Sequence, residues 1–283
     1  MTDHIRPYRA VILAGERPGG SPLSHAFNLS ASVMVPVAGK PALARVIQAI
    51  ADSHRSGGGI ICGPSADAIN GNKALQDLLQ QPGFAWLSPA SGPAASALAA
   101  LAKLDHYPAL LTAGDHALLS GEIVDDFCGQ ALALSPDHAA EKSTVSPGDE
   151  VPGYDFVIGF VPYALVKAAW PQSRRTVLKF SNGQFCGSNL FAIMNPQGLR
   201  ALDFWRQSEA DRKHPWRIAR RFGLLALVFY LLRRLSLEKA LSGLSAASGC
   251  RIGHVKVGFA RAAVDVDSIE DQQLAEKILN GKA

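Results

Sequence analysis

The chain has 283 residues, 48% of them hydrophobic, which is enough to bury a full core and argues against a disordered tail. Its formal net charge is +4 and no long block of like charges marks a nucleic-acid-binding arm, so a small polyanionic ligand fits better than DNA or RNA. The four cysteines are widely spaced, and their spacing indicates neither a zinc cluster nor a disulfide framework.

The first half of the chain alternates between strand and helix patterns. Its first apolar run is too short for a secretory signal, so we expect a cytoplasmic protein in a reducing compartment. Short apolar runs that end at glycine or a polar residue are typical of strands buried in a parallel sheet. Strands are predicted at residues 9–15, 57–63, 84–89 and 107–115, and helices at 41–53, 72–81 and about 94–104. This order indicates a doubly wound nucleotide-binding half over residues 1–130.

The second half has a different character. Residues 135–153 are polar and rich in Pro and Gly, which favours an exposed loop or lid. Three further strands are expected between residues 154 and 194, the last two joined in a hairpin near Asn182-Gly183. Helices are expected over 199–247, and a closing strand over 254–267 is followed by a helix over 268–280. The predicted fold is a single α/β domain over 1–283: a Rossmann-like three-layer sandwich of the GT-A type with a mostly parallel sheet, an inserted β-hairpin and a helical segment.

Polar residues that follow buried strands are the first candidates for a site, because ligands of open α/β sheets bind beyond the carboxyl ends of the strands. The loop LAGERPGG after the first strand has glycines that permit close backbone approach, but it is neither a Walker loop nor a G-x-G-x-x-G loop. Asp115 ends the strand of TAGDHALLS, where a carboxylate suits Mg²⁺. Asp115 can instead cap the next helix, as can Ser120.

Two more carboxylates lie near the C-terminus. Asp265 and Asp267 occupy alternate positions of the predicted closing strand and therefore share one face. Either is a candidate second metal ligand. The alternative is that these acids only favour the start of the last helix, where Ser268 with Asp271 resembles a capping box.

Taken in order, these stretches resemble the nucleotidyltransferases of the GT-A-type fold, in particular the NTP transferase domain of the molybdenum-cofactor guanylyltransferase type. The resemblance covers most of the chain and is weakest in the middle and over 199–247. The stretches that carry it are VILAG, PVAGKPAL, TAGDHALLS and VDSIED.

The resemblance implies Mg²⁺ held by Asp115 and Asp267, with Asp265 in reserve. It also implies a nucleotide bound by the glycine loop and by the segment that usually contacts base or ribose. The residues are Leu13, Ala14, Gly15 and Glu16 in the loop, and Ser91, Gly92 and Ser96 in the segment. For the segment, a glycine-started helix packed closely on a strand is an equally good interpretation.

The chain departs from the family pattern at the positions of two basic residues. The family has a lysine shortly before the PVAGKP segment, and this place falls at about Ser32; the loop arginine, Arg17, comes earlier than usual. We expect Arg17 and Lys40 to supply the catalytic positive charge and to act with Asp115 in catalysis, although Lys40 also suits the turn that enters the helix. The departure leaves altered chemistry, or binding without turnover, open.

The acceptor side is inferred from charge. Arg174, Arg175 and Lys179, with Asn189 nearby in sequence, are predicted to bind a phosphorylated acceptor, because adjacent arginines can grip a phosphate bidentately. A solvated basic face is the alternative, also for the basic residues within 212–217. The apolar run 222–232 between arginine pairs is too short to span a bilayer. This run is typical of a buried core helix. The alternative interpretation is a helix that makes weak contact with a membrane surface.

The sequence therefore predicts an Mg²⁺-dependent transfer of a nucleotidyl group from an NTP to a phosphorylated small-molecule or lipid-linked acceptor, with release of pyrophosphate. One alternative is a metal-dependent glycosyltransferase, since Asp265-Val266-Asp267 is a D-x-D triplet, although this triplet lies at the end of the chain rather than in mid-sheet. The other is a nucleotide-binding protein without catalysis.

Overall fold

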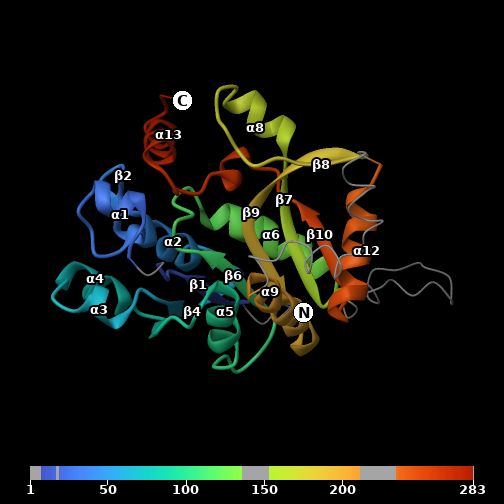
Figure 1. Cartoon of the computed structure of the whole chain (residues 1–283), viewed down its shortest axis with the longest axis horizontal. Helices are drawn as coiled ribbons and strands as arrows, with labels where there is room; N and C mark the ends of the chain where they lie inside the picture. The colour runs from blue at the N-terminus through green and yellow to red at the C-terminus, as the bar shows by residue number, and fades with distance from the viewer. Residues whose placement is uncertain (1–7, 17–18, 136–152, 211–233, 283) are drawn as a thin grey trace.

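A computed structural model describes residues 8–16, 19–135, 153–210 and 234–282 of the chain (Figure 1). The strands are β1 (Tyr8–Leu13), β2 (Pro36–Val37), β3 (Lys40–Pro41), β4 (Ser56–Cys62), β5 (Phe84–Leu87), β6 (Ala109–Ala113), β7 (Phe156–Pro162), β8 (Leu178–Phe180), β9 (Gly183–Ile193) and β10 (Ile252–Lys256). The α-helices are α1 (Pro22–Ala26), α2 (Ala42–Ala51), α3 (Ala66–Ile69), α4 (Lys73–Leu79), α5 (Pro93–Leu101), α6 (Gly121–Ala133), α8 (Tyr163–Ala169), α9 (Leu199–Ala210), α12 (Leu237–Ser248) and α13 (Ile269–Leu279). Short 3-10 turns are η1 (Ser32–Met34), η2 (Pro196–Gly198) and η4 (Ala260–Ala263).

The central sheet has eight strands within the described residues, in the order β10-β7-β9-β6-β1-β4-β5, with β8 paired to β9. The strands β6, β1, β4 and β5 run parallel to one another, and β10 runs parallel to β7. Only β9 is antiparallel to the neighbours on both its sides, β6 and β7, and it forms the predicted hairpin with β8. The mostly parallel α/β sheet expected from the sequence is confirmed.

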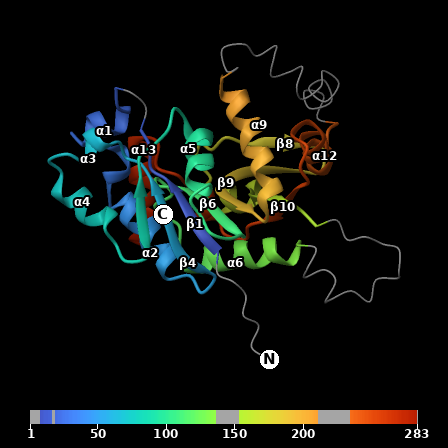
Figure 2. The same ribbon diagram turned by 90° about the horizontal axis from the view of Figure 1, so that it is seen from below.

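Helices cover both faces of this sheet, so the fold has three layers (Figure 2). Helices α2 and α6 lie on one face, and α5, α9 and α12 lie on the other. Alternate residues of β1 serve the two layers, because successive side chains of a strand point to opposite faces: Ile12 packs under α2, whereas Val11 packs with the residues of α5.

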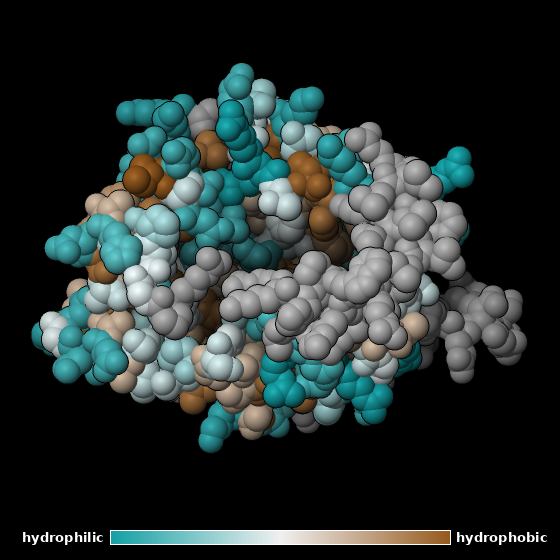
Figure 3. Space-filling model, in the orientation of Figure 1, coloured by the Kyte–Doolittle hydropathy of each residue, from teal (hydrophilic) through white to brown (hydrophobic). Residues whose placement is uncertain are grey.

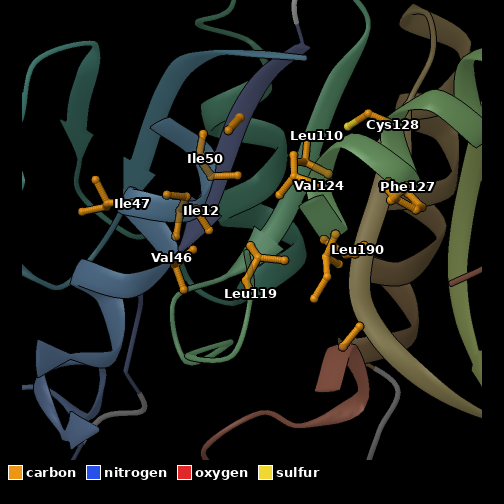
Figure 4. Packing of buried hydrophobic residues seen from close by; sticks show 14 of the residues in the cluster. Ile12, Val46, Ile47, Ile50, Leu110, Leu119, Val124, Phe127, Cys128 and Leu190 are labelled. Atoms are coloured by element: carbon orange, nitrogen blue, oxygen red, sulfur yellow. The ribbon is translucent and has the colours of Figure 1, made fainter. Parts of the chain in front are cut away.

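The core under α2 and α6 explains why these helices form where they do (Figure 4). In α2 the buried residues Leu43, Val46, Ile47 and Ile50 recur at helical spacing and make one apolar stripe. They meet Ile12 of β1 and the buried side chains of α6.

The closing segment differs from the prediction. A strand was expected over 254–267, but β10 ends at Lys256 and η4 follows, so Asp265 and Asp267 lie in extended chain outside the sheet. The alternation of burial survives: Val264 and Val266 are buried and Asp267 is exposed. The alternation of apolar residues correctly predicted which side chains are buried, but it wrongly predicted that this segment pairs in the sheet. Pairing needs the edge of a neighbouring strand, and the sequence pattern does not contain that information.

The expected strand before the hairpin is also shorter, since β8 begins at Leu178 and leaves Arg175 outside it. Helix α8 was not predicted. The described parts of 199–247 form α9 and α12 as expected, whereas the predicted lid over 135–153 and the apolar run 222–232 lie almost wholly or wholly outside the described residues.

A buried acid ties three element ends together at the edge of the sheet opposite the predicted site. Asp155, at the start of β7, accepts hydrogen bonds from Asn195 Nδ2 at 2.9 Å, from the Arg251 backbone nitrogen at 2.8 Å and from Arg251 Nη2 at 2.8 Å. Burial alone would raise the pKa of Asp155, but the hydrogen bonds from Arg251 and Asn195 outweigh it and lower this pKa to about 2.

Asp155→Ala is therefore expected to reduce the free energy of unfolding by about 3 kcal/mol, because it leaves several donors without their charged partner. The stabilisation by Asp155 is present above its unfolded pKa near 4 and is lost as the pH falls towards about 2. Urea unfolding at pH 7 and pH 3 measures both effects. The control is Asp203→Ala, which removes a surface pair with Arg206 and is expected to cost less than about 1 kcal/mol. Equal losses in the two variants would contradict the assignment.

Candidate functional site

The carboxyl ends of the parallel strands meet at one edge of the sheet. Leu13 at the end of β1 is in register with Cys62 of β4 on one side and with Ala113 of β6 on the other. The glycine loop after β1 and Asp115 after β6 therefore leave the sheet side by side, and the Gly114 nitrogen donates to the Leu13 carbonyl at 2.8 Å. This edge is where open α/β sheets bind ligands.

The glycine loop lies against the turn after β4. A side-chain carbon at Gly63 would lie 2.6 Å from the Gly15 nitrogen, and Gly63 has φ +97°, so glycine is required there for close approach of the two backbones. Leu13 is half-buried, Ala14 is buried and Gly15 is exposed. Arg17 lies outside the described residues.

Glu16 is held inside its own loop. Its carboxylate accepts hydrogen bonds from the Ser32 backbone nitrogen and the Ser24 hydroxyl, both at 2.7 Å. Ser32 is the place where the family carries a lysine. The carboxylate of Glu16 therefore engages the backbone nitrogen at the position where the resemblance gives the family a lysine and this chain has Ser32.

The segment after β5 forms a helix start. Gly92 is the N-cap of α5, and Ser96 is buried, with its hydroxyl accepting from the Ala90 nitrogen at 2.9 Å. Ser91 is exposed at the same edge. The close-packed, glycine-started helix is thus present; Ser91 is exposed, whereas Gly92 is half-buried, with the Glu209 carboxylate close to it.

Asp115 is joined directly to the closing segment. Its backbone carbonyl accepts from the Val266 nitrogen at 3.1 Å, and Val264 and Val266 pack in a small buried cluster with Ala117 and Leu118. This packing brings carboxylates about 150 residues apart in sequence into one group, because Asp265 and Asp267 flank the buried Val266. Ser120 and Ser268 cap the following helices, so neither Asp115 nor Asp267 is needed as a cap.

The carboxylate of Asp115 is electrostatically unsatisfied. Its Oδ1 atom is buried and has no hydrogen-bond partner. Burial, together with the nearby negative charges of Asp267 and Asp265, raises the pKa of Asp115 to about 7. The adjacent His116 is fully buried, and this burial lowers its pKa to about 4, so the ring is neutral at pH 7 and cannot compensate for the acids.

Asp265 has partners for both of its oxygens. Arg175 Nη1 donates to Oδ1 at 2.8 Å and Asn189 Nδ2 to Oδ2 at 3.2 Å. Asn189 lies in a bulge of β9 with φ +51°, an uncommon conformation for a residue with a side chain. Arg175 also pairs with Asp271 at the start of α13. These contacts hold Asp265 in place and leave Asp267 as the more exposed of the two acids.

The carboxylates fit a hard divalent cation. In the part of the chain that the structure describes, no group of three or more histidine, cysteine or acidic side chains is arranged to hold a metal. Attachment through two carboxylates, with the remaining positions taken by water and phosphate oxygens, is what Mg²⁺ commonly uses. Asp115, with its orphan oxygen, and the exposed Asp267, whose charge acts on it, are the two carboxylates that this mode of attachment would use.

The predicted cations are dispersed. Arg175 and Asn189 lie at the carboxylate group, whereas Arg174 is exposed at the cavity beside α13 and Lys179 is exposed on β8. Lys40 is exposed at the start of β3, and its side chain has no hydrogen bond or ion pair among the described residues. The structure thus brings the predicted acids together and does not bring the predicted cations together.

Sequence reasoning missed the pairing of Arg175 with Asp265 and Asp271, and the enclosure of Glu16. Partners 90 and 96 residues apart leave no local pattern, so no sequence signal was available for Arg175. For Glu16, the serines at 21 and 24 that start α1 did offer a hint of a capped turn.

A sheet edge with a close-packed glycine loop beside a buried carboxylate is typical of nucleotide-binding α/β proteins. The chain belongs to the family of the MobA-like NTP transferase domain, whose model matches residues 10–176. The matched residues include the glycine loop, Lys40, Asp115, Arg174 and Arg175. The match confirms the resemblance seen in the sequence. No curated protein matches the chain.

Solved structures agree on the fold. A hypothetical transferase from Thermus thermophilus is 23% identical, with a TM-score of 0.70, and the match covers 94% of this chain and 99% of the other. A CMP:2-keto-3-deoxy-manno-octonic acid synthetase complexed with CTP is 10% identical, with a TM-score of 0.56 and coverage of 98% and 100%. A 4-diphosphocytidyl-2C-methyl-D-erythritol synthase from Anaerococcus prevotii is 12% identical, with a TM-score of 0.51 and coverage of 97% and 99%. Fold and family are those of nucleotidyltransferases.

No helix among the residues described is long and apolar enough to cross a membrane.

Proposed function

We propose that the protein transfers a nucleotidyl group from an NTP to a phosphorylated acceptor, depends on Mg²⁺ and releases pyrophosphate. The observation that carries the proposal is the Asp115 carboxylate, which is buried at the ligand-binding edge of the sheet beside the glycine loop, with Oδ1 lacking a partner. Burial, together with the charges of Asp267 and Asp265, raises its pKa to about 7. A buried carboxylate beside other negative charges is costly unless a cation binds there.

Each residue has a role that follows from its position. The backbone of Ala14 and Gly15, at the end of β1, can approach the nucleotide closely, and Ser91 with Gly92 borders the same edge. Asp115 and Asp267 would hold Mg²⁺, which when bound supplies positive charge to the phosphate oxygens. Asp265 is positioned by Arg175 and Asn189 and adds negative charge without being a free ligand.

The protein's contribution to the transfer is positioning and charge neutralisation, as is general for phosphoryl chemistry. An acceptor phosphate oxygen forms the new bond to the α-phosphorus, and the bond to the pyrophosphate oxygen breaks on the opposite side. Lys40, exposed at the start of β3, and Arg17 are the cations that we assign to the phosphates. No covalent bond to the chain is required.

Two other functions make different predictions. A glycosyltransferase would use Asp265-Val266-Asp267 as its metal motif, but Asp265 has both oxygens engaged and the family match favours an NTP substrate. A binding protein without turnover is favoured by one observation, the engagement of the Ser32 nitrogen by Glu16 where the family has a lysine.

The test is a pyrophosphate-release screen of the four common NTPs against phosphorylated sugars, polyols, pterins and lipid-linked phosphates, with and without Mg²⁺. We expect release with one acceptor class, and only when Mg²⁺ is present. Sugar transfer from nucleotide sugars without pyrophosphate would replace the proposal with the glycosyltransferase. NTP binding in calorimetry without release under any acceptor would replace it with the binding protein.

A further inference from the structure

A cavity of about 660 Å³ lies between the segment that follows α8 and the helix α13. The two helices stand next to each other on the side of the molecule where the closing segment runs (Figure 1). The surface over them is largely hydrophilic with apolar patches (Figure 3). The wall of the cavity includes neither Asp115 nor any residue of the glycine loop.

Two donors in the cavity wall lack partners. Arg175 has a side chain only 8% exposed, and its Nε is buried without a hydrogen bond although both its terminal nitrogens are paired. Two residues earlier, Ser173 Oγ is likewise buried without a partner. Native structures leave few buried donors unsatisfied, and two in one cavity wall indicate a missing acceptor.

The charges of the wall favour an anion. Arg174 and Lys277 are exposed at the cavity and have no ion pair within the described part of the chain. Asp271 is paired with Arg175, so Glu270 is the one acid in the described part of the wall that has no ion pair there. Apolar side chains complete the wall, namely Trp170, Pro171 and Leu274.

We propose that this cavity binds a small organic anion, with its phosphate or carboxylate group at Ser173, Arg174, Arg175 and Lys277 and its apolar part against Trp170 and Leu274. Binding does not depend on the proposed function. A consequence does rest on it: because Arg175 also holds Asp265, the anion adds negative charge near the carboxylate group and tightens Mg²⁺ binding there. By thermodynamic linkage, bound Mg²⁺ increases the affinity for the anion by the same factor.

The experiment is calorimetry on the full chain with three probes: phenyl phosphate, inorganic phosphate and phenol. We expect phenyl phosphate to bind more tightly than either of the others, because it alone has both parts. In Arg174→Ala/Lys277→Ala its affinity falls at least tenfold, while Lys103→Ala, which removes an exposed cation at a different cavity, keeps it. Saturating phenyl phosphate is expected to tighten Mg²⁺ binding about twofold to fivefold in the unaltered protein only.

Circular dichroism of each variant checks that the fold is kept, and the two altered side chains are exposed and unpaired. Equal affinity for phenyl phosphate in the double variant, or no binding of any probe, would overturn the site. Inorganic phosphate binding as tightly as phenyl phosphate would overturn the apolar part of the assignment. Mg²⁺ binding that ignores phenyl phosphate would overturn the coupling alone. Failure of every acceptor in the pyrophosphate screen would leave these binding results unaffected, so the two proposals fail separately.

Discussion

Asp115→Asn is expected to reduce the rate of Mg²⁺-dependent pyrophosphate release by at least about 10²-fold while the fold is retained. The change removes one negative charge from a buried carboxylate that has no hydrogen-bond partner on Oδ1, and asparagine has nearly the same shape. The remaining acids, with Asp265 engaged by Arg175 and Asn189, cannot replace it. Steady-state rates at several Mg²⁺ concentrations measure the effect once the acceptor is known.

The matched control for this variant is Asp77→Asn on α4, a solvent-exposed carboxylate that pairs only with Lys73. Its rate should equal that of the unaltered protein. An Asp115→Asn protein with the same rate and the same Mg²⁺ dependence would remove Asp115 from the metal site. A protein that unfolds instead would be detected by circular dichroism, and Mg²⁺ binding measured on Asp267→Asn would then test the pair from its other member.

The second large effect is on stability. Because the folded pKa of Asp115 is about 7 and its usual value is near 3.8, the folded chain keeps a proton that the unfolded chain has lost between these pH values. The contribution of Asp115 to folding stability is therefore most favourable below pH 4, becomes less favourable as the pH rises to about 7, and is constant above it. The shift corresponds to about 4 kcal/mol.

Urea unfolding of the unaltered chain and of Asp115→Asn, from pH 4 to pH 8, isolates this contribution, because asparagine does not titrate. In the absence of metal, the stability of the unaltered chain minus that of the variant is expected to fall as the pH rises. Mg²⁺ at pH 8 should restore it in the unaltered chain and leave the variant unchanged. A difference that is flat across this range would show that the pKa of Asp115 is not raised in the folded chain, and an Mg²⁺ effect in both proteins would place the cation elsewhere.

The local patterns of the sequence were sufficient for most of the architecture. Apolar runs such as residues 9–15 and the helical spacing of Leu43, Val46, Ile47 and Ile50 are set by which faces must be buried, so β1 and α2 are readable without a partner. The hairpin at Asn182-Gly183 follows from turn chemistry in the same way. Where the pattern required a pairing partner, as for residues 257–267, it failed, because alternate burial occurs in extended chain with or without a neighbouring strand.

The same distinction between local patterns and long-range contacts applies to the candidate site. That acids after a buried strand and near the C-terminus belong to one site rested on motif order and resemblance, and the Asp115–Val266 backbone bond now places them in one group. Which of Asp265 and Asp267 is the more exposed acid was open in the sequence, and Asp265 is held by Arg175 and by Asn189 in the bulge of β9.

By itself, the sequence determined the layers and the family, because these depend on local burial patterns and on short motifs in order. The tertiary structure alone decided that Arg175 serves Asp265 and Asp271, that Glu16 closes its own loop, and that a cavity lies beside α13. The reason is that charged side chains pair with groups that are close in space. Partners up to 96 residues apart in sequence come together only when the sheet and the closing segment have packed.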